Sequence, residues 1–167
     1  SIESDLMRQC RNVALIGMPG SGKTSAGRNL AELCGRTFVD MDVDFSERYG
    51  RTPADVINED GEQSFRRMET EALAEVAKRS SLVISCGGGV VTRPENLPLL
   101  RQNSTVVMID RKAEELSSRG RPISQQRGIQ ALAAERMPLY RAWADTVVSC
   151  TGSARGDALE IMRRLSL

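Results

Sequence analysis

Residues 12–24 read NVALIGMPGSGKT, and this stretch decides the fold. Residues 12–16, which are apolar after Asn12, predict a short buried strand, and residues 17–24 match the pattern G-x-x-x-x-G-K-[ST]. In this pattern the glycines let successive backbone N–H groups turn inward around phosphate oxygens, and the helix that follows adds its positive end. Lys23 would reach the β- and γ-phosphates, and the Thr24 hydroxyl can bind Mg²⁺. The stretch therefore predicts a nucleoside triphosphate site.

Short apolar runs alternate with helical patterns along the rest of the chain. Further strands are expected at 37–39, 82–85, 105–109 and 146–148. Helices are expected over 43–49, from 53 onward, around 65–76, and at 94–100, 130–140 and 159–165, with a polar, mobile loop at 120–128. Continuous apolar strands separated by helices are typical of a parallel sheet buried on both faces. The sequence predicts one three-layer α/β domain over residues 1–167.

The composition excludes several classes of protein. The chain contains no histidine, which rules out a Ser-His-Asp triad, a His-ligated zinc site and an imidazole acid-base catalyst. The four cysteines are widely spaced without a C-x-x-C pair, so we expect reduced thiols in a cytoplasmic protein. A net charge of +1 and the lack of a long apolar run predict neither a nucleic-acid partner nor a membrane span. The chain starts at Ser1 rather than Met, so a domain of a longer fusion is an open alternative.

A phosphate-binding loop does not by itself name the reaction. A GTPase would carry an Asn-Lys-x-Asp guanine motif, and the sequence has none. Motor and assembly ATPases usually need a longer chain. The class that remains is a compact kinase, which transfers a phosphoryl group to a small acceptor.

Acidic residues follow two of the expected strands. Asp40 and Asp42 flank Met41 at the end of the strand 37–39, and in a strand-like turn they would point the same way. One carboxylate could hold the water shell of Mg²⁺, and the other could accept the proton of the acceptor's hydroxyl. The alternative is a solvated turn. Asp110 ends another apolar strand and is a rival metal ligand of the Walker B kind.

Two further motifs could bind an anionic substrate. Arg66 and Arg67 follow apolar Phe65 on an expected helix, so at least one could face inward, and Glu69 could orient Arg66. Such an arginine can hold a carboxylate through two hydrogen bonds. The glycines 87–89 follow an expected strand and would let the backbone approach a ligand closely. The alternatives are a solvated basic helix face and a flexible turn.

The polar loop and its surroundings contain three arginines, Arg119, Arg121 and Arg127. A phosphoryl-transfer transition state spreads negative charge over its equatorial oxygens, and an arginine delivered by a closing lid would stabilise it. Closure would also exclude water, which would otherwise compete as acceptor. We therefore expect a lid at 117–130. The alternative is an ordinary surface loop.

Together these motifs resemble those of the shikimate kinase family. They occur in the family's order and near its spacing, and they cover most of the chain from about residue 12 to the last helix. The matching segments are GMPGSGKT (17–24), DMD (40–42), GEQSFRRME (61–69), GGGVV (87–91), RP (121–122) and RMPLY (136–140). The stretch between Arg119 and Arg136 is shorter than in many family members, a departure that affects the lid and the adenine contacts.

The resemblance implies a fold and a reaction. The family fold is a five-stranded parallel sheet in the order 2-3-1-4-5 with a mobile lid, close to that of the nucleoside monophosphate kinases. The implied reaction is phosphorylation of shikimate to shikimate 3-phosphate by ATP with Mg²⁺, a step of chorismate and aromatic amino acid biosynthesis. The implied oligomeric state is a monomer.

The resemblance also implies roles for individual residues. The catalytic residues would be Lys23, Asp42 and the lid arginine Arg121. The substrate would bind Asp42, Arg66, Glu69, Gly87, Gly88, Gly89 and Arg136, with its carboxylate held by Arg66 and Arg136. The nucleotide would bind Gly20, Ser21, Gly22, Lys23, Thr24, Ser25, Arg119, Arg121 and Ser153, with the loop 151–153 beside the adenine. Mg²⁺ would bind Thr24 and, through water, Asp40.

Two functions other than shikimate phosphorylation are open alternatives. Gluconate kinase, or another small hydroxy-acid kinase, would share the fold but has no reason to combine GEQSFRRME with RMPLY. A non-catalytic nucleotide-binding module would be expected to have lost at least one of Lys23, Asp42, Arg66, Arg121 and Arg136. The role of Asp42 as a base is also open, because a loose transition state needs little early proton removal.

Overall fold

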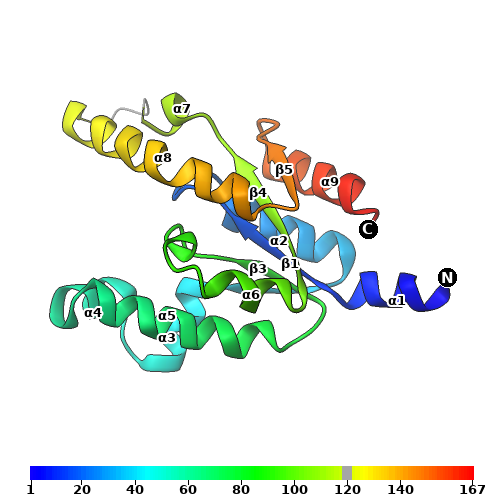
Figure 1. Ribbon diagram of the computed structural model, residues 1–167. Coiled ribbons are helices and arrows are strands. Elements are labelled where there is room, and N and C mark those ends of the chain that lie inside the picture. The colour runs from blue at the N-terminus through cyan, green and yellow to red at the C-terminus, as the bar shows by residue number, and fades with distance from the viewer. Residues whose placement is uncertain (118–121) are drawn as a thin grey trace.

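A parallel β-sheet forms the centre of the protein (Figure 1). The computed structural model describes residues 1–117 and 122–167. Within these residues the sheet has five strands in the order β2-β3-β1-β4-β5, which confirms both the α/β class and the expected strand order. The strands are β1 (Asn12–Ile16), β2 (Thr37–Asp40), β3 (Leu82–Ser85), β4 (Ser104–Asp110) and β5 (Thr146–Ser149).

Helices connect the strands and cover both faces of the sheet (Figure 1). Those described are α1 (Ile2–Cys10), α2 (Lys23–Cys34), α3 (Met41–Tyr49), α4 (Pro53–Asp60), α5 (Glu62–Ala77), the 3₁₀ helix Val90–Thr92, α6 (Asn96–Arg101), α7 (Ala113–Ser117), α8 (Ile123–Trp143) and α9 (Ala154–Leu165). None of them combines the length and hydropathy that crossing a bilayer requires.

Alternate residues of the central strand, β1, belong to two separate hydrophobic cores. Val13 and Leu15 of β1 pack on one face of the sheet with side chains of α2 and α9. Ala14 and Ile16 pack on the other face with side chains of α5, α6 and α8. Because a strand directs successive side chains to opposite faces, an uninterrupted apolar run is what a strand covered on both sides requires. All five residues of β1 are accordingly buried.

Three expectations about helices need correction. Helix α8 begins at Ile123, so the part of the expected loop between 123 and 128 is helical. That stretch is rich in Gln, Ser and Arg, and its side chains are mostly exposed, so it forms a helix without the apolar periodicity that sequence reasoning looked for. Helix α6 begins at Asn96, two residues after the expected start. Helix α1 precedes the first strand and was not expected.

The position of the first strand is fixed by a buried amide. Asn12, which is fully buried, donates from Nδ2 to the carbonyl of Arg79 at 2.8 Å. Its Oδ1 accepts from the N–H of Leu82, the first residue of β3, at 2.9 Å. The side chain therefore joins the starts of two neighbouring strands and aligns their carboxyl ends, where ligands bind in sheets of this kind.

We predict that Asn12→Ala lowers the free energy of unfolding by about 2 kcal/mol, because it leaves a buried N–H without an acceptor. Urea denaturation followed by circular dichroism measures the change. Asn103→Ala is the matched control, since the exposed Asn103 amide donates to the same Arg79 carbonyl at 2.9 Å. Equal losses in the two variants would contradict the role given to Asn12.

Candidate active site at the carboxyl end of the sheet

The phosphate-binding loop connects β1 to α2 in a conformation that its glycines permit. Gly20 and Gly22 have φ angles of 79° and 96°, which favour glycine. Gly22 caps α2 without any side-chain hydrogen bond, so the first N–H groups of this helix are left for a ligand. The buried Ser21 hydroxyl has no hydrogen-bond partner among the described atoms. The loop is therefore built to receive an anion.

Lys23 is a buried cation at the mouth of this loop. Its Nζ donates to the carbonyls of Gly17 and Met18, both at 2.9 Å, and the residue is only 7% exposed. Burial lowers the pKa of the Lys23 amine to about 8, against an ordinary value of 10.5, and the nearby Asp40 and Asp42 partly oppose the shift. A bound phosphate would place a negative charge beside this buried, protonated amine.

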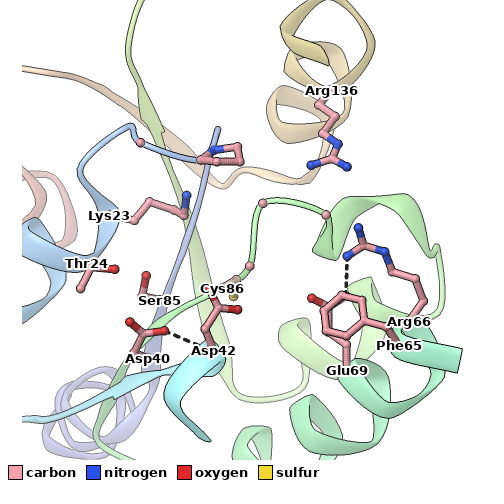
Figure 2. Close-up of a pocket in the computed structure, with 15 residues that line it drawn as sticks. Lys23, Thr24, Asp40, Asp42, Phe65, Arg66, Glu69, Ser85, Cys86 and Arg136 are labelled. Atoms are coloured by element: carbon pink, nitrogen blue, oxygen red, sulfur yellow. Dashed lines mark hydrogen bonds and ion pairs between the residues drawn. The ribbon is translucent and has the colours of Figure 1, made fainter. Parts of the chain in front are cut away.

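Lys23 opens onto a pocket of about 370 Å³ at the carboxyl end of the sheet (Figure 2). Segments that are far apart in the sequence supply its walls, namely the phosphate loop, the β2–α3 junction, α5, the end of β3 and α8. The described lining residues are Pro19, Gly20, Lys23, Thr24, Asp40, Asp42, Phe65, Arg66, Glu69, Ser85, Cys86, Gly87, Gly88, Gly89 and Arg136. The pocket thus brings together every described residue that was expected to bind the acceptor.

The two aspartates reach the pocket by a different local geometry from the one expected. Asp40 has extended backbone and caps α3, and its Oδ1 accepts from the N–H of Asp42 at 2.9 Å. Asp42 lies in the first turn of α3, so the expected strand-like turn is wrong, because the chain enters a helix immediately after Asp40. Both carboxylates nevertheless line the pocket near Lys23 (Figure 2).

Burial raises the pKa of Asp42, and the neighbouring Asp40 charge adds to the shift, whereas Lys23 and Arg66 oppose it. A carboxylate that is more basic than usual is better suited to accept a hydrogen bond or a proton from a hydroxyl group. Cys86 lies close by and is no nucleophile. Burial raises the pKa of its thiol to about 12 and keeps it neutral.

On α5, Arg66 and Glu69 form the expected pair one helical turn apart. Nη1 of Arg66 donates to Oε1 of Glu69 at 3.0 Å, and both side chains are largely buried. Burial raises the pKa of Glu69, and the Arg66 guanidinium opposes that shift. Arg67 instead donates to the Ser64 hydroxyl and does not line the pocket. Of the two arginines, Arg66 is the one that faces inward.

Each glycine of the triple-glycine turn lies against a different part of the site. A Cβ at Gly87 would come within 2.9 Å of Oε2 of Glu69, and one at Gly88 within 2.8 Å of the Pro19 ring. A Cβ at Gly89 would overlap the Arg66 guanidinium. A side chain at position 88 would press on the rigid Pro19 ring, whereas at 87 and 89 the ends of the Glu69 and Arg66 side chains would have to move. This close packing favours the interpretation of the segment as a close backbone approach over a merely flexible turn.

Arg136 enters the pocket from α8, on the side opposite α5 (Figure 2). The Nε atoms of Arg136 and Arg66 are both buried without a hydrogen-bond partner among the described atoms. Guanidinium groups with free donors are suited to bind a carboxylate, since the fork of N–H groups matches its two oxygens.

A second pocket, of about 270 Å³, lies on the other side of the phosphate loop. Its walls include three expected nucleotide residues from the phosphate loop and the first turn of α2, and the expected loop after β5. The described lining residues are Ser21, Gly22, Ser25, Arg111, Cys150, Gly152, Ser153, Ala154 and Asp157. The two pockets therefore lie around one loop.

Sequence reasoning missed two residues of this second pocket. Asp157 is buried, and its Oδ1 accepts from the N–H and the hydroxyl of Thr151 at 2.7 and 2.8 Å, which fixes the loop after β5. Arg111 directly follows β4, and its position at the carboxyl end of a strand was the signal that could have found it.

Other expected residues fall outside the pockets. Asp110, the rival metal ligand, accepts from Arg141 at 3.0 Å and lines neither pocket. Arg127 is an exposed residue of α8. Arg119 and Arg121 lie outside the described residues, as does part of the expected lid, so their roles stay predictions.

The magnesium implied by the resemblance is compatible with the donors present. Thr24 and Asp40 both line the first pocket beside Lys23, and a hydroxyl with a carboxylate is the oxygen donor set that Mg²⁺ prefers. The described residues contain no group of three His, Cys, Asp or Glu side chains that could hold a metal without a ligand's help. Such a site suits an ion that arrives with a nucleotide.

Comparisons with known proteins agree with this geometry. The family model for shikimate kinase matches residues 19–166. The chain belongs to the shikimate kinase family. The shikimate kinase of Symbiobacterium thermophilum is 41% identical over 167 residues, covering 92% of this chain and 95% of that protein. The solved structure of the Acinetobacter baumannii shikimate kinase in complex with shikimate has a TM-score of 0.87 at 32% identity and covers 98% of this chain and 97% of that one.

A gluconokinase from Sinorhizobium meliloti has a TM-score of 0.66 at 20% identity, covering 95% of this chain and 94% of that one. At this level of identity the likeness extends to the fold alone. The rival assignment as a gluconate kinase therefore rests on a shared scaffold, whereas the shikimate kinase motifs also match in sequence.

We predict a specific pH dependence from the buried Lys23. Its pKa in the folded protein, about 8, lies below the ordinary value of 10.5, so between these values the unfolded chain binds more protons than the folded one. The free energy of unfolding should therefore rise with pH across this window, by at most about 3 kcal/mol. Urea denaturation from pH 7.5 to 10.5, with Lys23→Met as reference, measures the difference. Parallel pH profiles for the two proteins would contradict the shift.

Proposed function

We propose that this chain is a shikimate kinase that transfers the γ-phosphoryl group of ATP to a ring hydroxyl of shikimate, giving shikimate 3-phosphate and ADP. The observation that carries the proposal is the arrangement of one pocket. The carboxylate receptor of Arg66 and Arg136 lines the same cavity as the phosphate-binding Lys23, and Asp42 lines the wall near that lysine. An acceptor with a carboxylate at one end and hydroxyl groups on its ring fits this order.

At the acceptor end, Arg66 and Arg136 would bind the carboxylate, and the N–H groups of the glycine turn would contact the ring hydroxyls. The Arg66–Glu69 pair supports this role, because Glu69 holds the guanidinium in place and leaves its buried Nε free. Fixing the acid at its carboxylate orients the opposite side of the ring toward the nucleotide. Such positioning is the main contribution that a protein makes to phosphoryl transfer.

At the nucleotide end, the free N–H groups at the start of α2 and the amine of Lys23 would bind the phosphates. The second pocket would take the nucleoside, between Ser25 and the loop that Asp157 holds. Thr24 and, through water, Asp40 would hold Mg²⁺, which when bound neutralises phosphate charge. The lid arginine Arg121 would add a positive charge at the transferring group.

Asp42 would accept a hydrogen bond from the attacking hydroxyl. In the transfer, the hydroxyl oxygen forms a bond to the γ-phosphorus, the bond from that phosphorus to the β,γ-bridging oxygen breaks, and the hydroxyl proton passes to Asp42. Burial, which raises the pKa of this carboxylate, favours that final position of the proton. Orientation of the hydroxyl contributes even where proton removal is late.

The resemblance to the shikimate kinase family supports a monomeric enzyme. The four cysteines are free thiols, as is usual in the reducing cytoplasm, and this supports a cytoplasmic location.

We predict that Asp42→Asn lowers kcat by about 100-fold, because it removes the carboxylate that receives the hydroxyl proton. Asp110→Asn should lower kcat less than about threefold, since Asp110 pairs with Arg141 outside the pocket. Steady-state ADP release measures both. The reverse ranking would make Asp110 the metal aspartate.

We predict that Arg136→Met raises the KM for shikimate by about 100-fold, since a buried carboxylate would lose a charged hydrogen-bond partner. The KM for ATP should stay within about twofold, because Arg136 lies at the acceptor end. Equal increases in both KM values would contradict the carboxylate-binding role.

The function is tested by ADP release with Mg²⁺-ATP and one acceptor at a time, using shikimate, quinate, gluconate and a nucleoside monophosphate. Turnover with shikimate at least 100-fold above the others is expected. Preferential turnover of another acceptor would support a kinase activity but contradict shikimate as the substrate. Nucleotide binding without any turnover would favour the non-catalytic module.

A further inference from the structure

Tyr140 makes a buried hydrogen bond to the triple-glycine turn. Its side chain is fully buried, and the hydroxyl donates to the carbonyl of Gly88 at 2.5 Å. The two residues are 52 positions apart in the sequence, so this bond joins α8 directly to the end of β3. The phenol itself does not line the pocket, but the residue to which it bonds does.

Gly88 is held on two sides. A Cβ at this position would meet the Pro19 ring of the phosphate loop at 2.8 Å, so the backbone lies tightly against that loop. The Tyr140 bond fixes the carbonyl of the same residue from α8. The N–H groups that the turn offers to an acceptor are therefore located relative to both the phosphate loop and α8.

Tyr140 also lies one helical turn after Arg136 on α8. Burial raises the pKa of the Tyr140 hydroxyl, whereas the positive charge of the Arg136 guanidinium opposes the shift. Residues i and i+4 of a helix are neighbours on one face, which places both side chains on the side of α8 that faces the site. The phenol thus lies one turn along α8 from Arg136 and donates to the carbonyl of Gly88.

We propose that Tyr140 is a positioning residue, whose hydroxyl group fixes the Gly88 backbone relative to α8, the helix that carries Arg136. The acceptor's carboxylate and its ring would be bound by Arg136 and the Gly88 backbone at a set separation. The inference rests on the proposed role of Arg136 at the carboxylate. It adds a residue outside the pocket. Removing its hydroxyl group should weaken binding of the acid and leave binding of the nucleotide unchanged.

The test uses Tyr140→Phe, which removes only the hydroxyl, in the full chain. We expect the KM for shikimate to rise by about tenfold, the effect of one lost buried hydrogen bond, with the KM for ATP within about twofold. Tyr49→Phe is the matched control, because the Tyr49 hydroxyl also donates to a backbone carbonyl, that of Met68 at 3.1 Å, away from the pocket. The control should leave both KM values unchanged.

A second readout separates positioning from general loosening. The ratio of kcat/KM for shikimate to that for its carboxamide reports how well the charge of the carboxylate is recognised. Tyr140→Phe should lower this ratio, whereas a merely structural role would reduce both substrates alike. An unchanged ratio, a parallel rise in both KM values, or an unchanged KM for shikimate would each overturn the proposal.

The Arg136→Met variant, measured in the same series, shows whether the proposed carboxylate receptor or only the role of Tyr140 is wrong. If it leaves shikimate binding intact, the proposed carboxylate receptor is wrong, and the role of Tyr140 fails with it. If Arg136→Met weakens shikimate binding but Tyr140→Phe does not, the receptor stands and only the positioning role is overturned.

Discussion

The acceptor half of the site depends on how closely the backbone at 87–89 approaches its neighbours. Each glycine of the turn occupies space in which a Cβ would press on Glu69, on Pro19 or on Arg66. The end of β3, the phosphate loop and α5 therefore share one thin wall. Because this wall is backbone, it lets the α5 side of the pocket lie close to the phosphate loop. A larger residue at position 88 would press on the Pro19 ring of that loop.

The pocket combines buried positive and negative side chains whose charges a ligand could offset. Lys23, Arg66 and Arg136 supply positive charge, and three carboxylates lie among them in the same cavity. Burial lowers the pKa of Lys23 and raises that of Asp42, so each charged form carries a desolvation cost. A phosphate beside Lys23 and a carboxylate between the arginines would offset part of that cost. Under the proposed function the pocket would bind two anions, one at each end, and Asp42 would face a hydroxyl.

Sequence reasoning predicted what depends on local pattern and missed what depends on distant contacts. The strands, the phosphate loop and the Arg66–Glu69 pair follow from runs and spacings within a few residues. The turn at Asp42 was misjudged, because an N-cap and an extended turn have similar sequences. The bond from Tyr140 to Gly88 could not be predicted, since no local pattern relates a phenol to a carbonyl 52 residues away. Arg119 and Arg121 lie outside the described residues, and their roles remain predictions.

The most direct test of the whole account is a crystal structure of the enzyme with ADP, Mg²⁺ and shikimate bound together. We predict that the shikimate carboxylate accepts hydrogen bonds from both Arg66 and Arg136. A ring hydroxyl should lie within hydrogen-bond distance of Asp42, on the side facing the β-phosphate and Lys23. A shikimate bound in the opposite orientation, with its carboxylate toward Lys23 and the two arginines without a ligand, would contradict the account.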